Sequence, residues 1–136
     1  MKRILPLILA AMLLLTGCAT STADSTPAPD AKPTYRQISQ EEAKSMIDAQ
    51  NVLILDVREQ DEFDAGHIPD AVLLPVGTID EATAAQVIPE KDSVVLVYCR
   101  SGNRSKTASQ KLADLGYTEI YEFGGINTWP YDIVVN

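Results

Sequence analysis

The chain has 136 residues, of which 46% are hydrophobic and 22% charged, and its formal net charge at pH 7 is −8. That length suits one globular domain rather than two. The acidic balance argues against nucleic-acid binding, which requires a basic surface. The chain holds two cysteines, Cys18 and Cys99, and a single histidine, His67.

The first residues have the order of parts found in a signal peptide: a short basic start, MKR, and then an apolar run at residues 4–15. This run is short for a helix that spans a bilayer. The LTGC segment at residues 15–18 resembles the lipobox of bacterial lipoproteins, which implies cleavage before Cys18 and lipid attachment to its thiol. We therefore predict a signal peptide at residues 1–17 and anchoring in the membrane of a bacterial cell envelope. Ala19 favours the periplasmic face of the outer membrane over the outer face of the cytoplasmic membrane.

The next segment, residues 18–34, consists mainly of Ala, Ser, Thr, Pro and Asp and has no apolar periodicity. Such a composition cannot form a core, so we predict a disordered tether and assign the folded domain to residues 35–136. Loss of residues 1–17 would remove two basic residues and lower the net charge from −8 to −10. With Cys18 acylated, Cys99 has no partner for an internal disulfide, and a lone thiol in an oxidising compartment indicates chemistry.

Predicted strands and helices alternate along the folded domain. In chain order we predict a strand at residues 35–38, a helix after Ser39, a strand at 52–55, a helix at 60–65, a strand at 71–74, a helix at 81–87, a strand at 93–98, a helix at 105–115 and a strand at 119–123. Ser39 and Glu42 have the spacing of a capping box at the start of the first helix. Phe63 is expected to point inward from the second helix.

The apolar pattern of these elements defines the fold class. Continuous apolar runs such as VLIL at residues 52–55 are typical of parallel strands buried on both faces. In the last helix, Ala108, Leu112 and Leu115 form a stripe at helical spacing. The sequence therefore predicts an α/β fold with a mostly parallel central sheet of about five strands and helices on both faces.

Cys99 follows the predicted strand at residues 93–98 and opens a loop that runs into the last helix. Ligands of open α/β sheets bind at the carboxyl ends of the strands. Backbone N–H groups and the positive end of the helix dipole stabilise anions at such a point, a thiolate included. Arg100 and Arg104 add charge of the favourable sign, so we expect the pKa of Cys99 to lie below its ordinary value of about 8.5.

The spacing of Cys99 and Arg104 separates two kinds of chemistry. Cysteine-dependent phosphatases have a similar layout but place five residues between the cysteine and the arginine, which gives a loop wide enough for a phosphate. Here four residues lie between Cys99 and Arg104. The shorter loop favours the smaller terminal sulfur of a persulfide, and it argues against phosphate hydrolysis.

Several segments together resemble a single-domain rhodanese, a thiosulfate sulfurtransferase-like domain. These segments are the Cys99–Arg104 loop, LDVRE at residues 55–59 with EF at 62–63, GHIP at 66–69 and GGINTW at 124–129. The resemblance covers residues 35–136. One departure is Asp70, which stands in a turn where a glycine is usual.

The resemblance implies a rhodanese-like fold and the transfer of sulfane sulfur from a small anionic donor, such as thiosulfate, to a thiophilic acceptor through a persulfide on Cys99. It implies that the backbone N–H groups of the loop surround this persulfide, and the residues that bind substrate are then Arg100, Ser101, Gly102, Asn103, Arg104 and Ser105. Arg104 is the first choice to hold the donor. No cofactor is implied, and we expect a monomer. The alternative is a sulfur-relay or redox-sensing module that acts only with a protein partner.

Other polar residues have structural interpretations. Asp56 and Arg58 lie near the same sheet edge as Cys99 and either support the loop or form a structural salt bridge, which we favour. His67 is expected to be a hydrogen-bonded turn residue, and Trp129 to pack over the end of the sheet. The acidic run at residues 59–64 is expected to be a solvated helix face, and no cluster has the spacing of metal ligands.

Overall fold

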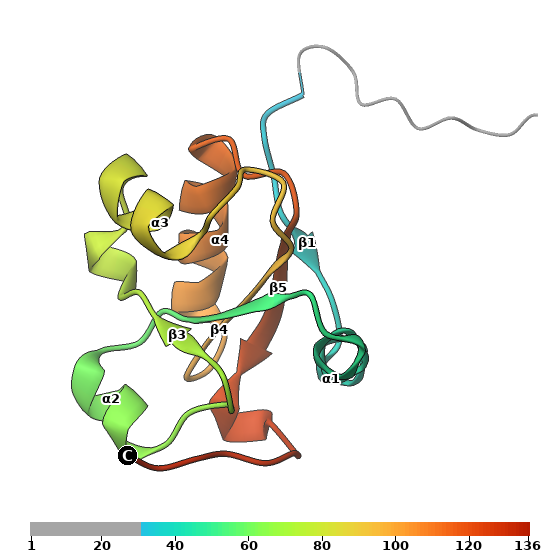
Figure 1. Cartoon of the computed structure of the whole chain (residues 1–136), viewed down its shortest axis with the longest axis vertical. Helices are drawn as coiled ribbons and strands as arrows, with labels where there is room; N and C mark the ends of the chain where they lie inside the picture. Colours follow the sequence, from blue (N-terminus) through green and yellow to red (C-terminus); the bar gives the residue numbers. More distant parts are fainter. Residues whose placement is uncertain (1–30) are drawn as a thin grey trace, which may run out of the picture. The chain divides into compact units, whose positions relative to one another are not determined.

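The computed structural model of the chain describes residues 31–136, and residues 32–136 form one compact unit. Five parallel strands make a single sheet in the order β1-β5-β4-β2-β3 (Figure 1). The predicted signal peptide, most of the predicted tether and Cys18 lie outside the described residues. Within residues 31–136, no helix is both long enough and apolar enough to cross a membrane.

The strands confirm the predicted parallel sheet. They are β1 (Arg36–Gln37), β2 (Leu53–Asp56), β3 (Val72–Leu73), β4 (Val95–Cys99) and β5 (Ile120–Gly125). Every pairing between neighbours is parallel. The central strand, β4, is buried at all five positions, as its continuous apolar run predicts.

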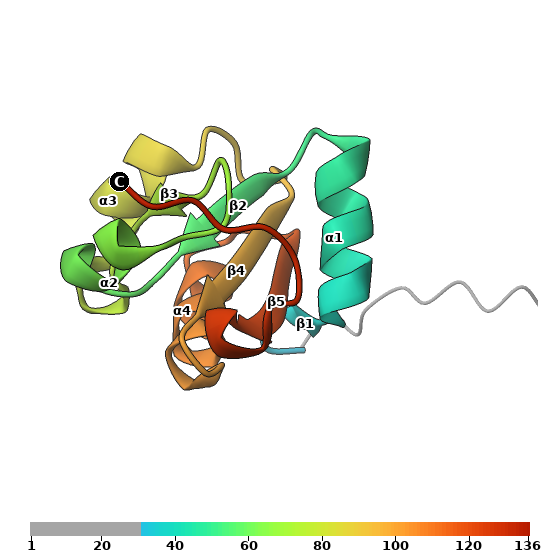
Figure 2. The same cartoon turned by 90° about the horizontal axis from the view of Figure 1, so that it is seen from below.

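Helices cover both faces of the sheet. They are α1 (Gln40–Ala49), α2 (Gln60–Ala65), α3 (Glu81–Val87) and α4 (Asn103–Asp114), with short 3₁₀ turns η1 (Val76–Thr78) and η2 (Ile126–Thr128). Figure 2 shows α1 on one side of the sheet and α3 and α4 on the other. The predicted α/β architecture, a parallel sheet with helices on both faces, is therefore confirmed.

Successive residues of β4 point to opposite faces of the sheet. Val97 and Cys99 belong to the core cluster that contains Ala108 and Leu112 of α4. Tyr98 belongs to the other cluster, together with Ala43 of α1. This period-2 alternation places the Cys99 side chain on the α3–α4 face of the sheet and Tyr98 on the α1 face.

The element boundaries differ from the predicted ones at the functional loop. β4 continues through Cys99, and α4 begins at Asn103 rather than at residue 105. The turn is this tight because Gly102, immediately before the helix, adopts a φ of +105°, which a residue with a Cβ rarely adopts. The helices at residues 60–65 and 81–87 begin and end as predicted.

Two side-chain predictions for the helices are confirmed in part. The Ser39 hydroxyl accepts a hydrogen bond from the Glu42 backbone N–H at 3.0 Å, which confirms the Ser39 half of the predicted capping box of α1. Phe63 points inward, as expected, because it is half-buried and packs on the buried His67, but it belongs to neither core cluster. No residue of α2 is buried, because this short helix lies beyond the core clusters, and the Phe63 ring stacks on His67 with 3.8 Å between the ring centroids.

Candidate active site

The site lies at the carboxyl end of the central strand, β4, just before α4. Cys99 is the last residue of β4, the loop comprises residues 100–102, and α4 begins at Asn103. The strands on both sides of β4 run parallel to it, so its carboxyl end meets those of β2 and β5 at the same edge. This is the edge at which open α/β sheets bind ligands.

The sulfur of Cys99 is enclosed by hydrogen-bonding groups of this loop. The residue is 1% exposed, and its Sγ accepts a hydrogen bond from the Gly102 backbone N–H at 3.0 Å. The Ser105 Oγ lies 3.5 Å from the sulfur. Burial acts to raise the pKa of Cys99, but its hydrogen bond with the Ser105 hydroxyl and those from the backbone N–H groups of Ser105, Gly102 and Ser101 outweigh it. The net effect is a lowered pKa, which confirms the direction expected from the sequence.

The GGINTW segment holds the loop from the other side. The Arg100 carbonyl oxygen accepts a hydrogen bond from the Asn127 backbone N–H at 3.1 Å. A Cβ at Gly125 would lie 2.1 Å from that same oxygen, so only glycine fits between β5 and the loop. Gly125 also pairs with Cys99 across the two strands. The position of the sulfur therefore depends on the close approach of two backbones.

The guanidinium of Arg104 is paired with a carboxylate of α2. It forms two hydrogen bonds to the Glu62 carboxylate, at 2.7 and 2.8 Å. The bond from Arg104 lowers the pKa of Glu62 to about 2. The expectation of a solvated acidic face on residues 59–64 is therefore wrong for Glu62, because α2 lies close enough to α4 for the pair to form. It holds for the exposed Glu59, Asp61 and Asp64.

We expect Glu62→Gln to lower the free energy of unfolding by about 1 kcal/mol at pH 7, because the pair is bidentate but partly exposed. Since the folded-state pKa of Glu62 is depressed, its contribution is present above its ordinary pKa of 4.5 and is lost as the pH falls toward about 2. Urea unfolding at pH 7 and at low pH measures this. The difference between wild type and variant should vanish at low pH.

The matched control is Asp61→Asn on the same helix, since Asp61 is exposed. We expect its effect to stay within about 0.5 kcal/mol at either pH. A Glu62→Gln penalty that is the same at low and neutral pH would show that charge pairing with Arg104 is not its origin.

The remaining loop residues differ in exposure. Arg100, Ser101 and Asn103 are exposed, whereas Gly102 and Ser105 are buried. Within residues 31–136, no salt bridge of 4.0 Å or less involves Arg100. Arg100, which follows Cys99 directly in the chain, therefore has no salt-bridge partner among the described residues, whereas Arg104 has one.

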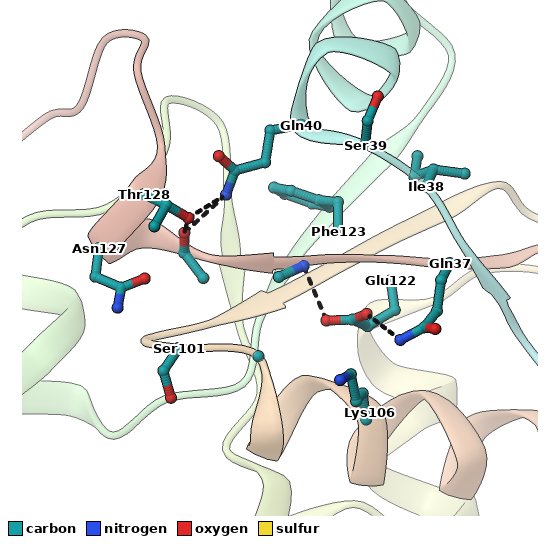
Figure 3. A pocket seen from close by; sticks show the side chains of 13 residues that line it. Gln37, Ile38, Ser39, Gln40, Ser101, Lys106, Glu122, Phe123, Asn127 and Thr128 are labelled. Atoms are coloured by element: carbon teal, nitrogen blue, oxygen red, sulfur yellow. Dashed lines mark hydrogen bonds between the residues drawn. The ribbon is translucent and has the colours of Figure 1, made fainter.

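A cavity of about 430 Å³ opens beside the loop, between β1, α1, β5 and α4 (Figure 3). Its polar lining includes Ser101, Lys106, Glu122, Asn127 and Thr128. Cys99 does not contribute to the lining, in keeping with the cover over its sulfur. The cavity thus touches the loop through Ser101 and Gly102 without exposing the thiol.

The favoured interpretation of Asp56 and Arg58 as a structural salt bridge is confirmed. Both are buried, and Arg58 Nη2 lies 2.7 Å from Asp56 Oδ2. The Tyr98 hydroxyl donates to the same carboxylate at 2.6 Å, and Arg58 also donates to the Gly66 carbonyl oxygen. Since Tyr98 points to the face opposite Cys99, the pair supports the sheet and does not reach the sulfur.

His67 and Trp129 also have the structural roles expected of them. His67 Nδ1 lies 2.9 Å from the Phe63 carbonyl oxygen, which as an acceptor requires the proton on Nδ1. Trp129 packs on Phe123, with 5.4 Å between ring centroids, in the core cluster of the α1 face. Among residues 31–136, no three His, Cys, Asp or Glu side chains are grouped in a way that would hold a metal ion.

One residue of the site, Glu122, was not predicted from the sequence. It lies on β5, is 3% exposed, and accepts a hydrogen bond from Ser105 Oγ at 2.6 Å. The available signal was a lone carboxylate inside a predicted strand, between Tyr121 and Phe123. A buried carboxylate requires hydrogen-bond donors, so it marks a polar site behind the strand.

Comparisons with known proteins agree with this geometry. Residues 39–130 match the rhodanese-like domain family. The chain is 35% identical over 96 residues to the thiosulfate sulfurtransferase GlpE of Coxiella burnetii, covering 70% of this chain and 87% of that protein. It is 39% identical to a sulfurtransferase of Allochromatium vinosum, covering 64% of this chain and 79% of that one. These relatives support sulfurtransferase activity.

The chain is also similar to solved structures of rhodanese-related proteins. A rhodanese-related protein of Thermoplasma volcanium has a TM-score of 0.62 and 31% identity, with 75% of this chain and 100% of that chain covered. A rhodanese from E. coli has a TM-score of 0.58 and 27% identity, with 62% of this chain and 98% of that chain covered. From its family match, its relatives and the cysteine loop at the end of β4, the chain belongs to the rhodanese-like domain family.

Proposed function

We propose that this chain is an extracytoplasmic sulfurtransferase that passes sulfane sulfur from a small anionic donor to a thiophilic acceptor through a persulfide on Cys99. The observation that carries the proposal is the position of the Cys99 sulfur. It lies at the carboxyl end of the central strand, before α4, and accepts the Gly102 N–H at 3.0 Å. Such a site stabilises a sulfur anion.

The reaction has two displacement steps. In the first, the Cys99 thiolate attacks the outer sulfur of a donor such as thiosulfate. The sulfur–sulfur bond of the donor breaks, and sulfite leaves with the electron pair. In the second, an acceptor such as cyanide attacks the outer sulfur of the persulfide, and the Cys99 thiolate is released. Neither step requires a cofactor.

The loop residues have distinct roles in this proposal. The backbone N–H groups from Arg100 to Ser105 stabilise the charge of the persulfide, as an oxyanion hole stabilises a developing charge. Arg100 is exposed, follows Cys99 directly in the chain and has no salt bridge within residues 31–136, so we place it first as the group that binds the anionic donor. Arg104, which is paired with Glu62, shapes the loop and adds to its positive potential.

The place of action follows from the predicted leader. Acylation of Cys18 would attach the domain to a membrane of a bacterial cell envelope, on the periplasmic face of the outer membrane or the outer face of the cytoplasmic membrane. The tether would let a monomer move near that surface. Whole-chain mass spectrometry of protein from cells tests this: the mature chain should lack residues 1–17 and carry acyl groups. An unmodified leader would contradict the anchor.

The experiment for the reaction combines two readouts on the same protein. Intact mass after exposure to thiosulfate should show one added sulfur atom on Cys99, and thiosulfate with cyanide should yield thiocyanate over many turnovers. If neither appears, the proposal fails. Hydrolysis of an aryl phosphate would instead indicate a phosphatase, against the interpretation of the four-residue spacing between Cys99 and Arg104.

The alternative function is a sulfur-relay or redox-sensing module that works only with a protein partner. The 1% exposure of Cys99 favours it, because a covered sulfur needs an opening step that a partner can supply. A persulfide that forms without turnover to thiocyanate would favour this alternative over the enzyme.

A further inference from the structure

Glu122 is a buried carboxylate behind the Cys99 loop. Figure 3 shows its side chain beside that of Gln37. Its Oε1 accepts hydrogen bonds from the Gly124 N–H at 2.8 Å and from Ser105 Oγ at 2.6 Å, and its Oε2 accepts from Gln37 Nε2 at 3.3 Å. All three donors are neutral groups.

No cation compensates this carboxylate directly. Within residues 31–136, no salt bridge of 4.0 Å or less includes Glu122. On α4, Lys106 lines the adjacent cavity but is exposed, and Arg104 is committed to Glu62 of α2. On the loop, Arg100 is exposed; on β1, Gln37 is neutral and Arg36 pairs with Glu119. Glu122 is therefore held by neutral hydrogen-bond donors alone.

The Ser105 hydroxyl connects this carboxylate to the sulfur. It has a single proton but lies near several acceptors: Glu122 Oε1 at 2.6 Å, the Gly102 carbonyl oxygen at 2.9 Å, and Cys99 Sγ at 3.5 Å. A short bond to a carboxylate is the strongest of these, so the hydroxyl donates to Glu122 and accepts from the Cys99 thiol. The same hydroxyl can donate to a Cys99 thiolate only if Glu122 carries a proton.

We propose that Glu122 is a positioning residue that takes up the proton of Cys99 through the Ser105 hydroxyl. The S–H proton moves to Ser105 Oγ, the Ser105 proton moves to Glu122 Oε1, and the electron pair of the S–H bond stays on sulfur. The carboxyl group then donates to Ser105, which donates to the thiolate. The total charge of the three residues stays at −1, so the buried site never holds two negative charges. This inference rests on the proposed function, in which the thiolate is the attacking group.

The test measures the sign of an effect on Cys99 alkylation. Iodoacetamide labelling of the full chain, followed by mass spectrometry of the peptide that contains Cys99, reports the thiolate without any sulfur transfer. In Glu122→Gln the Gly124 N–H keeps the amide oxygen toward Ser105, which then remains a donor to residue 122. At pH values below the midpoint of the alkylation profile of Cys99, we expect the variant to be alkylated about tenfold more slowly than wild type. This is the effect of losing one hydrogen bond to a charged group. If Glu122 acted on Cys99 only through its negative charge, the variant should be alkylated faster than wild type, because removal of that charge favours the thiolate.

Ser105→Ala should slow alkylation by a similar factor, and the double variant should be no slower than either single variant, because one relay is broken in each case. Glu119→Gln is the matched control near the start of β5 and should alkylate as wild type does, with thermal unfolding confirming that all variants are folded. Glu122→Gln alkylating as fast as wild type or faster overturns the relay. Normal labelling of wild type with no sulfur uptake from thiosulfate would instead overturn the proposed function and leave the relay standing.

Discussion

Cys99→Ser is expected to abolish thiocyanate formation and sulfur uptake from thiosulfate. A serine hydroxyl is not ionised near neutral pH, and the hydrogen bonds that lower the pKa of the Cys99 thiol cannot bring an alcohol into that range. The variant also lacks the atom on which a persulfide forms. The measurement is the thiocyanate assay together with intact mass after thiosulfate treatment, both reduced to the background without protein.

This variant should lose its chemistry while keeping its fold. Cys99 is buried in the core cluster of the α3–α4 face, and a serine there can still accept the Gly102 N–H. We expect a loss of about 1–2 kcal/mol in the free energy of unfolding, the usual range for a change of this size in a core. Cys18→Ser is the control, and its turnover should equal that of wild type. Turnover by the Cys99→Ser variant would show that Cys99 does not carry the sulfur.

The fold and the place of Cys99 could be predicted because their signals are local in sequence. The run of apolar residues in β4 is continuous because both faces of the strand are buried, and the polar loop that follows ends it. The stripe of Ala108 and Leu112 marks the face of α4 that packs on the sheet. From these patterns alone, Cys99 falls between a strand and a helix.

The partners of the charged residues could not be predicted, because they depend on how distant elements meet. Arg104 and Glu62 are 42 residues apart, and their pairing requires α2 to lie beside the start of α4. Glu122 reaches Ser105 only because β5 is adjacent to β4. Each residue taken alone has several plausible partners, and only the packed structure selects one. The pairing of Arg104 with Glu62 is the reason that Arg100, and not Arg104, is placed first as the donor-binding residue.

Gly125→Ala is expected to have the second large effect, on both stability and the site. A Cβ at this position would lie 2.1 Å from the Arg100 carbonyl oxygen, 2.4 Å from its carbonyl carbon and 2.5 Å from the Ser101 nitrogen. All three are backbone atoms, so no side-chain rotation relieves the clash. With a φ of −134°, Gly125 has a backbone conformation that any residue adopts, and the penalty is therefore purely one of space.

To accept the methyl group, β5 and the loop must separate, which disturbs the pairing of Gly125 with Cys99 and the Asn127 bond to Arg100. We expect Gly125→Ala to lower the free energy of unfolding by about 3 kcal/mol, as severe overpacking does, and to slow Cys99 alkylation. Urea unfolding and the iodoacetamide assay measure the two effects.

Alanine variants of two other glycines serve as controls that distinguish a steric clash from backbone strain. Gly77→Ala meets no atom within 4 Å and should be neutral. Gly124→Ala has room for its Cβ, 3.7 Å from Gln40 Nε2, but a φ of +93°, so it should cost about 1–3 kcal/mol through backbone strain. A Gly125→Ala variant as stable and as reactive as Gly77→Ala would mean that the loop does not need its close approach to β5. The expected loss instead ties the reactivity of Cys99 to a contact between two backbones, one that no side chain in the loop can replace.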